Sequence, residues 1–189
     1  MLNELVVKNR SYRRFHQHTA IEMDILHQLI DIARCTASAR NIQPLKYMFS
    51  NTPEKNAIIF SCLGWAGYLK DWPGPEEGER PSAYIVILGD RSIAESVDCD
   101  HGIAAQTILL GAVEMGFGGC MIGNINRKQL HNTLSIPSQY RILLVIALGK
   151  PKENVVIETV ATDGDIKYWR DGSQVHHVPK RRLEDIIIE

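Results

Sequence analysis

Residues 100–115 limit most strongly how this chain can fold, because they have a helical pattern and are apolar on nearly every side. Their apolar members leave no continuous polar face: Ile103, Ala104, Ala105, Ile108, Leu109, Leu110, Ala112 and Val113. A helix that is apolar all round must be covered all round. We therefore expect this helix to lie in the core or in a subunit interface, and Gly116 suits the position just after its end.

Strands are predicted on both sides of this helix in the sequence. Residues 82–89 contain a nearly continuous apolar run from Tyr84 to Leu88, so both faces of that strand should be covered. Residues 141–148 form a second apolar run, and shorter strands are predicted at 46–50 and 118–123. The chain should therefore build its core around these strands.

Helices are interspersed with the strands. Thr19 and Glu22 have the spacing of a capping box and precede a helix whose apolar stripe includes Ile25 and Leu29. Further helices are predicted at residues 2–8, at residues 56–69, and after Asn126 as N-cap. This mixture predicts an α+β fold, with an antiparallel or mixed central sheet flanked by helices.

Length and charge exclude several classes of protein. A chain of 189 residues is expected to form one domain, residues 1–189. Its net charge of −1 creates no global field that would attract nucleic acid. No apolar run approaches the about 20 residues of a membrane helix, and the first residues lack a signal-peptide pattern. We therefore expect a cytoplasmic protein with neither nucleic acid nor a membrane as partner.

Metal binding and covalent catalysis are not expected. The four cysteines form no CxxC pair, which argues against zinc and against a disulfide framework. The histidine pairs His16/His18 and His176/His177 lack the i, i+4 spacing and the third carboxylate ligand of a metal site. No GxSxG motif is present, so nothing supports a hydrolytic nucleophile.

Polar groups suited to a ligand occur in a loop and in two basic clusters. The loop from Ser38 to Pro44 carries a hydroxyl, two carboxamides and a guanidinium, which suit a planar heterocycle whose edge alternates donors and acceptors. The basic clusters are Arg10/Arg13/Arg14, with Ser11 between them, and Lys180/Arg181/Arg182. If they converge in space they would make a phosphate site; the alternative is two solvated charge runs.

Three further segments have a composition that suggests a role. Gly118 and Gly119 follow the apolar helix, and they either let backbone approach a flat ligand or make a turn. Residues 65–81 combine aromatic residues with a loop rich in Pro, Gly and Glu, and are expected to form a lid. Residues 160–189 read as an extended C-terminal arm.

Taken together, these segments resemble the FMN-dependent nitroreductase family. Residues 10–15, RSYRRF, are similar to the family's R-S-x-R-x-F segment, and residues 36–44, TASARNIQP, to its A-P-S-x-x-N-x-Q-P-W loop. Residues 118–123, GGCMIG, look like its G-x-C-x-I-G strand, and residues 148–151, LGKP, like its L-G-x-P strand end. The four motifs occur in the family's order and cover essentially the whole chain.

The resemblance implies a fold, an assembly and a set of cofactor-binding residues. It implies a nitroreductase-like α/β/α sandwich with a mostly antiparallel sheet, a homodimer, and FMN at the subunit interface. Arg10 and Ser11 would hold the phosphate and ribityl end, and Arg13 would approach the pyrimidine edge of the flavin. The remaining cofactor-binding residues would be the partner's loop residues, the glycines near the ring and the basic residues of the arm: Ser38, Asn41, Gln43, Gly118, Gly119, Lys180 and Arg181.

The resemblance also implies an activity. NADH or NADPH would deliver hydride to the flavin N5 atom, and an electron-poor small molecule such as a nitroaromatic or quinone would accept it, in a ping-pong cycle. The flavin would carry the chemistry, so no protein side chain is assigned a catalytic role. Three alternatives stay open. Two of them bind flavin: a redox sensor or carrier with little reductase activity, and a flavin reductase or dehalogenase of narrower specificity. The third, which follows from the basic groups alone, is a non-flavin anion-binding module.

Overall fold

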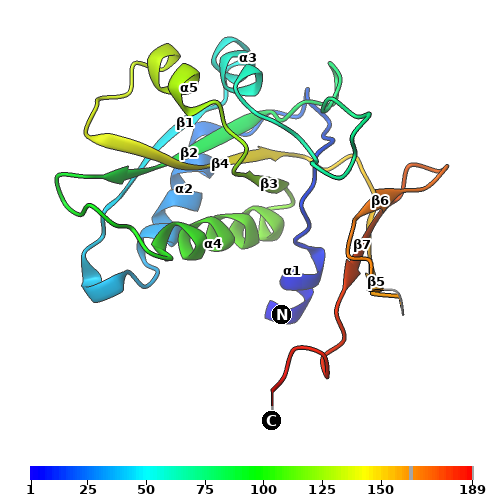
Figure 1. Ribbon diagram of the computed structural model, residues 1–189. Helices are drawn as coiled ribbons and strands as arrows, with labels where there is room; N and C mark the ends of the chain where they lie inside the picture. Colours follow the sequence, from blue (N-terminus) through cyan, green and yellow to red (C-terminus); the bar gives the residue numbers. More distant parts are fainter. Residues whose placement is uncertain (162–163, 189) are drawn as a thin grey trace.

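The computed structural model describes residues 1–161 and 164–188, and its centre is a four-stranded sheet (Figure 1). In spatial order the strands are β1 (Leu45–Ser50), β2 (Ala83–Asp90), β4 (Tyr140–Gly149) and β3 (Gly118–Ile122). Each neighbouring pair is antiparallel, with Met48 opposite Val86 and Val86 opposite Val145. The predicted antiparallel central sheet is confirmed.

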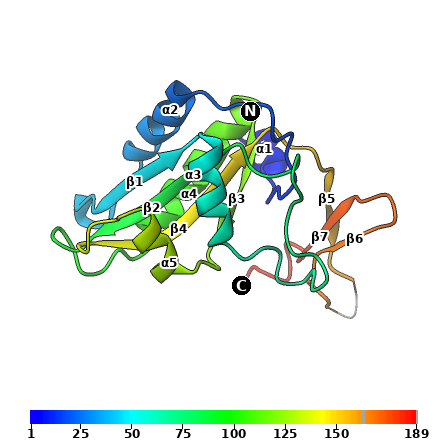
Figure 2. The same cartoon turned by 90° about the horizontal axis from the view of Figure 1, so that it is seen from above.

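Helices cover both faces of this sheet (Figures 1 and 2). On one face lie α2 (Met23–Arg34) and α4 (Asp100–Glu114), which pack against each other; α1 (Leu2–Lys8) also contacts α4. On the other face lie α3 (Pro53–Ser61) and α5 (Arg127–Thr133). The α+β sandwich predicted from the sequence and the resemblance is therefore the fold of the chain.

Strand β2 joins the two halves of the core. Its side chains alternate, so that Ala83, Ile85 and Ile87 belong to the cluster beneath α2 and α4. Tyr84 and Val86 point the other way, into the cluster beneath α3 and α5. Every residue of β2 is buried, which confirms that both of its faces are covered.

Helix α4 is buried by its own chain on most sides but not on all of them. Ala104, Ala105 and Ile108 are fully buried, whereas Ile103 is 36% exposed and Gln106 is exposed as well. Gly116 ends the helix with a φ of 80°, a left-handed conformation that glycine adopts without strain. One chain therefore leaves an open strip on α4, and burial of this strip in a subunit interface stays a prediction.

Two helix boundaries differ from the sequence expectations. Helix α2 begins at Met23 with Glu22 as N-cap, so the predicted Thr19 capping box does not form; the amide of Thr19 bonds instead to the carbonyl of His16. The helix predicted at residues 56–69 is α3, Pro53–Ser61, and it ends early. It ends because Leu63 pairs with Ile125 in an isolated bridge and draws the chain away.

The C-terminal part forms a second, smaller sheet beside the first (Figure 2). Its strands are β5 (Val155–Thr159), β7 (His176–Lys180) and β6 (Trp169–Arg170), with β7 parallel to β5 and antiparallel to β6. The sequence indicated only extended chain here. Among the described residues, no helix is long and apolar enough to cross a membrane.

Candidate functional site

A cavity of about 390 Å³ opens where the start of the chain meets β7 and α4. Its polar and basic lining residues are Asn9, Arg10, Ser11, Arg13, Gln106, Tyr168, His176 and Lys180. The structure thus brings together Arg10, Ser11, Arg13 and Lys180 from opposite ends of the sequence. Arg181 is exposed and does not line the cavity, and Arg14 turns away to pair with Glu79.

Backbone pairing with β3 holds the N-terminal side of this cavity in place. Ser11 forms a parallel bridge with Gly119, and the amide of Tyr12 donates to the Gly119 carbonyl at 3.0 Å. A Cβ on Gly118 would lie 2.6 Å from the Tyr12 ring, and one on Gly119 would lie 2.3 Å from the Ala147 carbonyl oxygen. Within this chain, the absence of a side chain at the two glycines leaves room for the Tyr12 ring and the Ala147 carbonyl. Both glycines lie in β3 and do not form a turn.

Arg13 faces the cavity from a closely packed position. Its guanidinium lies 4.7 Å from the centre of the Tyr168 ring. Its Nη1 donates to the Ser11 carbonyl at 3.1 Å and lies 3.3 Å from Nε2 of His176. Burial, followed by the charges of Arg13 and Arg170, lowers the pKa of His176 to about 4. A neutral His176 accepts a hydrogen bond from Arg13 and helps to orient it.

Glu153 anchors the backbone beneath Arg13, and no sequence pattern pointed to it. Its side chain is fully buried and accepts hydrogen bonds from the backbone amides of Arg13 and Arg14. Its second oxygen lies 3.0 Å from Nη2 of Arg170. Because these partners range from residue 13 to residue 170, the contact depends on the tertiary fold and has no local signal in the sequence.

Arg10 supplies a donor that the rest of the chain leaves free. Its Nη2 donates to the Val6 carbonyl at 2.6 Å, while its Nε is buried without a partner among the described residues. Arg10, Arg13 and Lys180 contribute three positive charges to the cavity lining, and the nearby carboxylate of Glu153 is engaged by Arg170. This arrangement suits an anion with several oxygen atoms, such as a phosphate.

The loop from Ser38 to Pro44 lies elsewhere, at the first turn of α4 (Figure 1). The Ser38 hydroxyl donates to the buried carboxylate of Asp100 at 2.5 Å, and the Ala39 amide donates to the same carboxylate at 3.0 Å. Gln106 and Leu109, which line the cavity, are six and nine residues further on, about 9 and 14 Å along the helix axis. The loop and the basic cavity are therefore separate within one chain.

The backbone of this loop adopts left-handed conformations at residues that are not glycine. Arg40, Asn41 and Gln43 all have positive φ values, of 52°, 57° and 54°. Non-glycine residues seldom adopt this region, and such conformations are concentrated at functional sites. Asn41 and Gln43 are exposed, and the Gln43 carboxamide nitrogen donates to the Asn41 carbonyl at 3.2 Å.

Residues 65–81 pack over the C-terminal sheet near the cavity. Tyr68 packs against Tyr168 with the two rings tilted by 57° and their centres 4.9 Å apart, and Arg170 lies 4.2 Å from the centre of the Trp72 ring. Glu79 binds Arg14 through two hydrogen bonds of 2.5 and 2.7 Å. This pairing, more than any other contact, lowers the pKa of Glu79 to about 2. The segment therefore steadies the residues around Arg13.

Comparison with known proteins finds similarity to the nitroreductase family in sequence and in fold. A model of the Nitroreductase family matches residues 76–150. YodC of Bacillus subtilis (strain 168), which is provisionally named an NAD(P)H nitroreductase, is 22% identical over 79% of this chain and 90% of its own. This match extends beyond the segment that the family model covers.

Solved structures of nitroreductases also resemble this chain. An FMN-dependent nitroreductase from Clostridium difficile R20291 is 25% identical over 82% of this chain and 89% of its own, with a TM-score of 0.66. A nitroreductase family protein from Streptococcus pneumoniae TIGR4 covers 100% of both chains with a TM-score of 0.72 at 16% identity, which is a likeness of fold. The resemblance to the nitroreductase family is therefore confirmed in sequence, and the chain has the nitroreductase fold.

Proposed function

We propose that this chain is an FMN-dependent oxidoreductase that transfers hydride from NADH or NADPH to an electron-poor small molecule, such as a nitroaromatic or quinone, in a ping-pong cycle. The observation that carries the proposal is the basic cavity, where Arg10, Ser11, Arg13 and Lys180 converge beside the glycine strand. The names of the related proteins, which include an NAD(P)H nitroreductase and an FMN-dependent nitroreductase, support it.

The donor set of the cavity fits FMN. The guanidinium of Arg10, the hydroxyl of Ser11 and the ammonium of Lys180 would bind the phosphate. Arg13 would lie at the flavin edge, where its positive charge favours the anionic reduced state. Gly118 and Gly119 would support this wall from behind, whereas Arg181 does not line the cavity and is left out of this donor set. FMN, when bound, supplies the hydride chemistry, which is why no nucleophile and base are needed.

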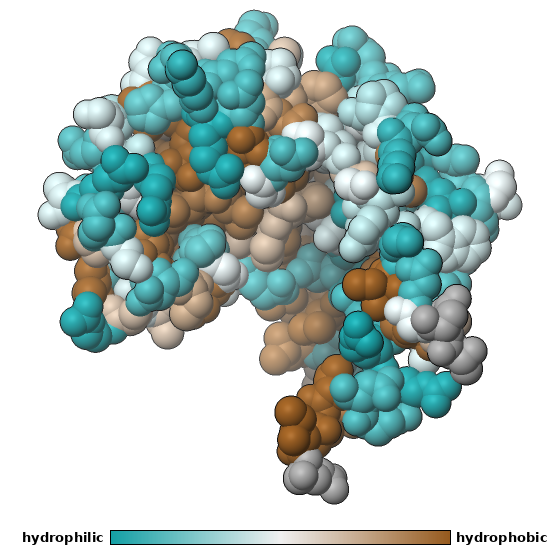
Figure 3. Space-filling view, in the orientation of Figure 1, coloured by the Kyte–Doolittle hydropathy of each residue, from teal (hydrophilic) through white to brown (hydrophobic). Residues whose placement is uncertain are grey.

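A homodimer would complete the site. The open strip of α4, with Ile103 36% exposed, is suited to burial by a partner. Apolar side chains are also exposed on α1 and at the C-terminal end, and Figure 3 shows both areas on one face. Leu2 is 68% exposed and Ile186 is 61% exposed. We infer that a second copy covers these surfaces and places its own Ser38, Asn41 and Gln43 at the flavin.

Purification followed by a turnover assay tests the function. The expected result is a yellow protein that releases FMN on denaturation and consumes NADH or NADPH when menadione or a nitrofuran is added. Flavin binding without turnover would favour a redox sensor or carrier instead. A colourless protein that cannot be reconstituted with FMN would refute the proposal.

Mixing two defective variants tests the shared site. Arg10→Ala should remove the phosphate contact, and the double variant Asn41→Gly/Gln43→Gly should remove both carboxamides while glycine tolerates their positive φ. Each variant alone should bind FMN poorly. After co-refolding, heterodimers carry one intact site each, so about a quarter of all sites should regain FMN if the loop comes from the partner. No recovery would mean that the loop acts within its own chain or not at all.

A further inference from the structure

Asp100, the first residue of α4, holds a buried carboxylate against the loop from Ser38 to Pro44. The residue is 3% exposed. Its Oδ2 accepts from the Ser38 hydroxyl at 2.5 Å, and its Oδ1 accepts from the Ala39 amide at 3.0 Å. A buried carboxylate is tolerated where hydrogen bonds of this kind satisfy it, and such charge-assisted bonds are strong. The start of the loop is therefore tied firmly to α4.

The Ser38 hydroxyl extends this constraint to the far end of the loop. Its hydrogen is donated to Asp100, while its oxygen accepts from the Gln43 amide at 2.9 Å. A hydroxyl has only one hydrogen, so the carboxylate decides which way the hydroxyl points and keeps its oxygen free to accept. One chain of hydrogen bonds thus runs from Asp100 through Ser38 to Gln43 and spans the loop.

The backbone of the loop needs such an outside constraint. Left-handed φ values at Arg40, Asn41 and Gln43 are unfavourable for residues that carry a Cβ, and they persist only where the surroundings hold them. Within the loop, the Asn41 amide donates to the Ser38 carbonyl at 2.8 Å, which closes a turn but does not attach the loop to the rest of the chain. Asp100 provides that attachment from α4.

We propose that Asp100 is a positioning residue, which holds the loop from Ser38 to Gln43 in the conformation that completes the partner's flavin site. This inference rests on the proposed function. Asp100 lies buried behind the loop and acts through it, whereas Asn41 and Gln43, which would reach the flavin, are exposed. A loop that is ordered in advance lowers the entropy cost of binding. Without the carboxylate, this cost would be met when FMN binds, and the affinity would fall.

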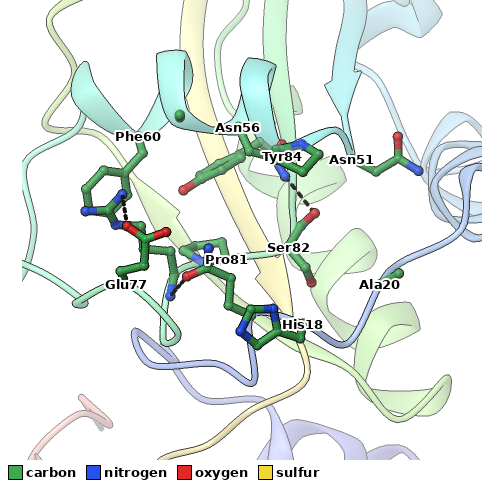
Figure 4. A pocket seen from close by; sticks show the side chains of 13 residues that line it. His18, Ala20, Asn51, Asn56, Phe60, Glu77, Pro81, Ser82 and Tyr84 are labelled. Carbon is green, nitrogen blue, oxygen red and sulfur yellow. Dashed lines mark hydrogen bonds and ion pairs between the residues drawn. The ribbon is translucent and has the colours of Figure 1, made fainter.

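Limited trypsin digestion of the full chain without added flavin tests whether Asp100 holds the loop. Arg40 is exposed, and trypsin cleaves the bond after it. Asp100→Ala should speed cleavage between Arg40 and Asn41 at least about ten-fold, because local opening becomes easier. Asn56→Ala is the control: it removes a buried hydrogen bond of 2.8 Å to the Ser82 carbonyl on the other face of the sheet (Figure 4), so cleavage after Arg40 should stay at the wild-type rate. Equal cleavage in Asp100→Ala and the wild type would overturn the inference.

FMN affinity and subunit mixing test whether the loop that Asp100 holds serves the partner's site. Asp100→Ala should bind FMN at least about ten-fold more weakly, and Asn56→Ala should bind it like the wild type. After co-refolding of Asp100→Ala with Arg10→Ala, about a quarter of all sites should regain FMN, because each heterodimer has one site with an intact loop and an intact Arg10. Co-refolding with Asn41→Gly/Gln43→Gly should restore no site, because both chains then carry a damaged loop.

The results that overturn this inference differ from failure of the proposed function. Faster cleavage after Arg40 in Asp100→Ala with unchanged FMN affinity would show that the carboxylate shapes a loop that the flavin does not use. No recovery with Arg10→Ala would show that the defect spreads beyond the loop. In both cases the wild type still binds FMN, so the proposed function stands. A wild type that binds no FMN would refute the proposed function and this inference with it.

Discussion

Replacing Glu153 with glutamine should destabilise the fold strongly, because this carboxylate joins three segments. It accepts from the amides of Arg13 and Arg14 through one oxygen and pairs with Arg170 through the other. Glutamine keeps the size and one carbonyl oxygen, so the two amides retain an acceptor. Its NH₂ group, however, would face the Arg170 guanidinium, donor against donor.

The size of the loss in stability follows from the burial of both side chains of the ion pair. The Glu153 side chain is 0% exposed and that of Arg170 is 9% exposed. Breaking a buried ion pair by removing one partner costs about 3–5 kcal/mol, and we expect about 3 kcal/mol because the amide contacts survive. For a chain of this length that loss lowers Tm by about 6–12 °C.

Urea denaturation followed by circular dichroism measures this loss. The matched control is Glu184→Gln, because Glu184 is 69% exposed and lies 3.8 Å from the exposed Arg182. An exposed pair of this kind contributes little, so the control should unfold like the wild type. If the free energy of unfolding of Glu153→Gln is less than about 1 kcal/mol below that of the wild type, the loss is no larger than for an exposed ion pair. The anchoring role given to Glu153 is then refuted.

Three shorter predictions follow from the same structure. Arg13→Ala should weaken FMN binding at least about ten-fold and lower the flavin reduction potential, measured by fluorescence and dye-linked titration; an unchanged potential would contradict its place at the flavin. The stability contributed by Glu79 is complete above its ordinary pKa of 4.5 and is lost as the pH falls toward about 2. The free energy of unfolding in urea should therefore change less between pH 5 and pH 3 in Glu79→Gln than in the wild type. An equal change in both proteins would rule out this contribution of Glu79. Gly119→Ala should destabilise by about 1–3 kcal/mol in urea, since its Cβ meets backbone at 2.3 Å, whereas Gly123→Ala has open space and should be neutral; equal effects would show that β3 adjusts freely.

The sequence predicted those parts of the fold whose signal is local. The apolar run from Tyr84 to Leu88 indicated a strand covered on both faces, and β2 is entirely buried. The end of α3 could not be predicted, because it depends on Leu63 pairing with Ile125, far along the chain. The small sheet of β5, β6 and β7 also rests on distant pairing, with Val155 opposite His176.

In the candidate site, too, the sequence predicted the residues that have a local signal and missed those that depend on distant contacts. Charge and spacing singled out Arg10, Arg13 and Lys180, which the fold brings around one cavity. Nothing in the sequence distinguished Lys180 from Arg181, because their difference depends on where β7 ends. The supporting role of Glu153 was not visible either, since its partners lie 17 to 140 residues away.

The affinity of FMN relative to riboflavin tests the central claim most directly, because the two flavins differ only in the phosphate. Flavin fluorescence quenching on titration with the protein measures both. If Arg10 and Lys180 bind the phosphate, FMN should bind at least about 100-fold more tightly than riboflavin. The double variant Arg10→Ala/Lys180→Ala should remove most of that difference. Equal affinity of the wild type for both flavins, or a preference for FMN that survives in the double variant, would contradict the phosphate site.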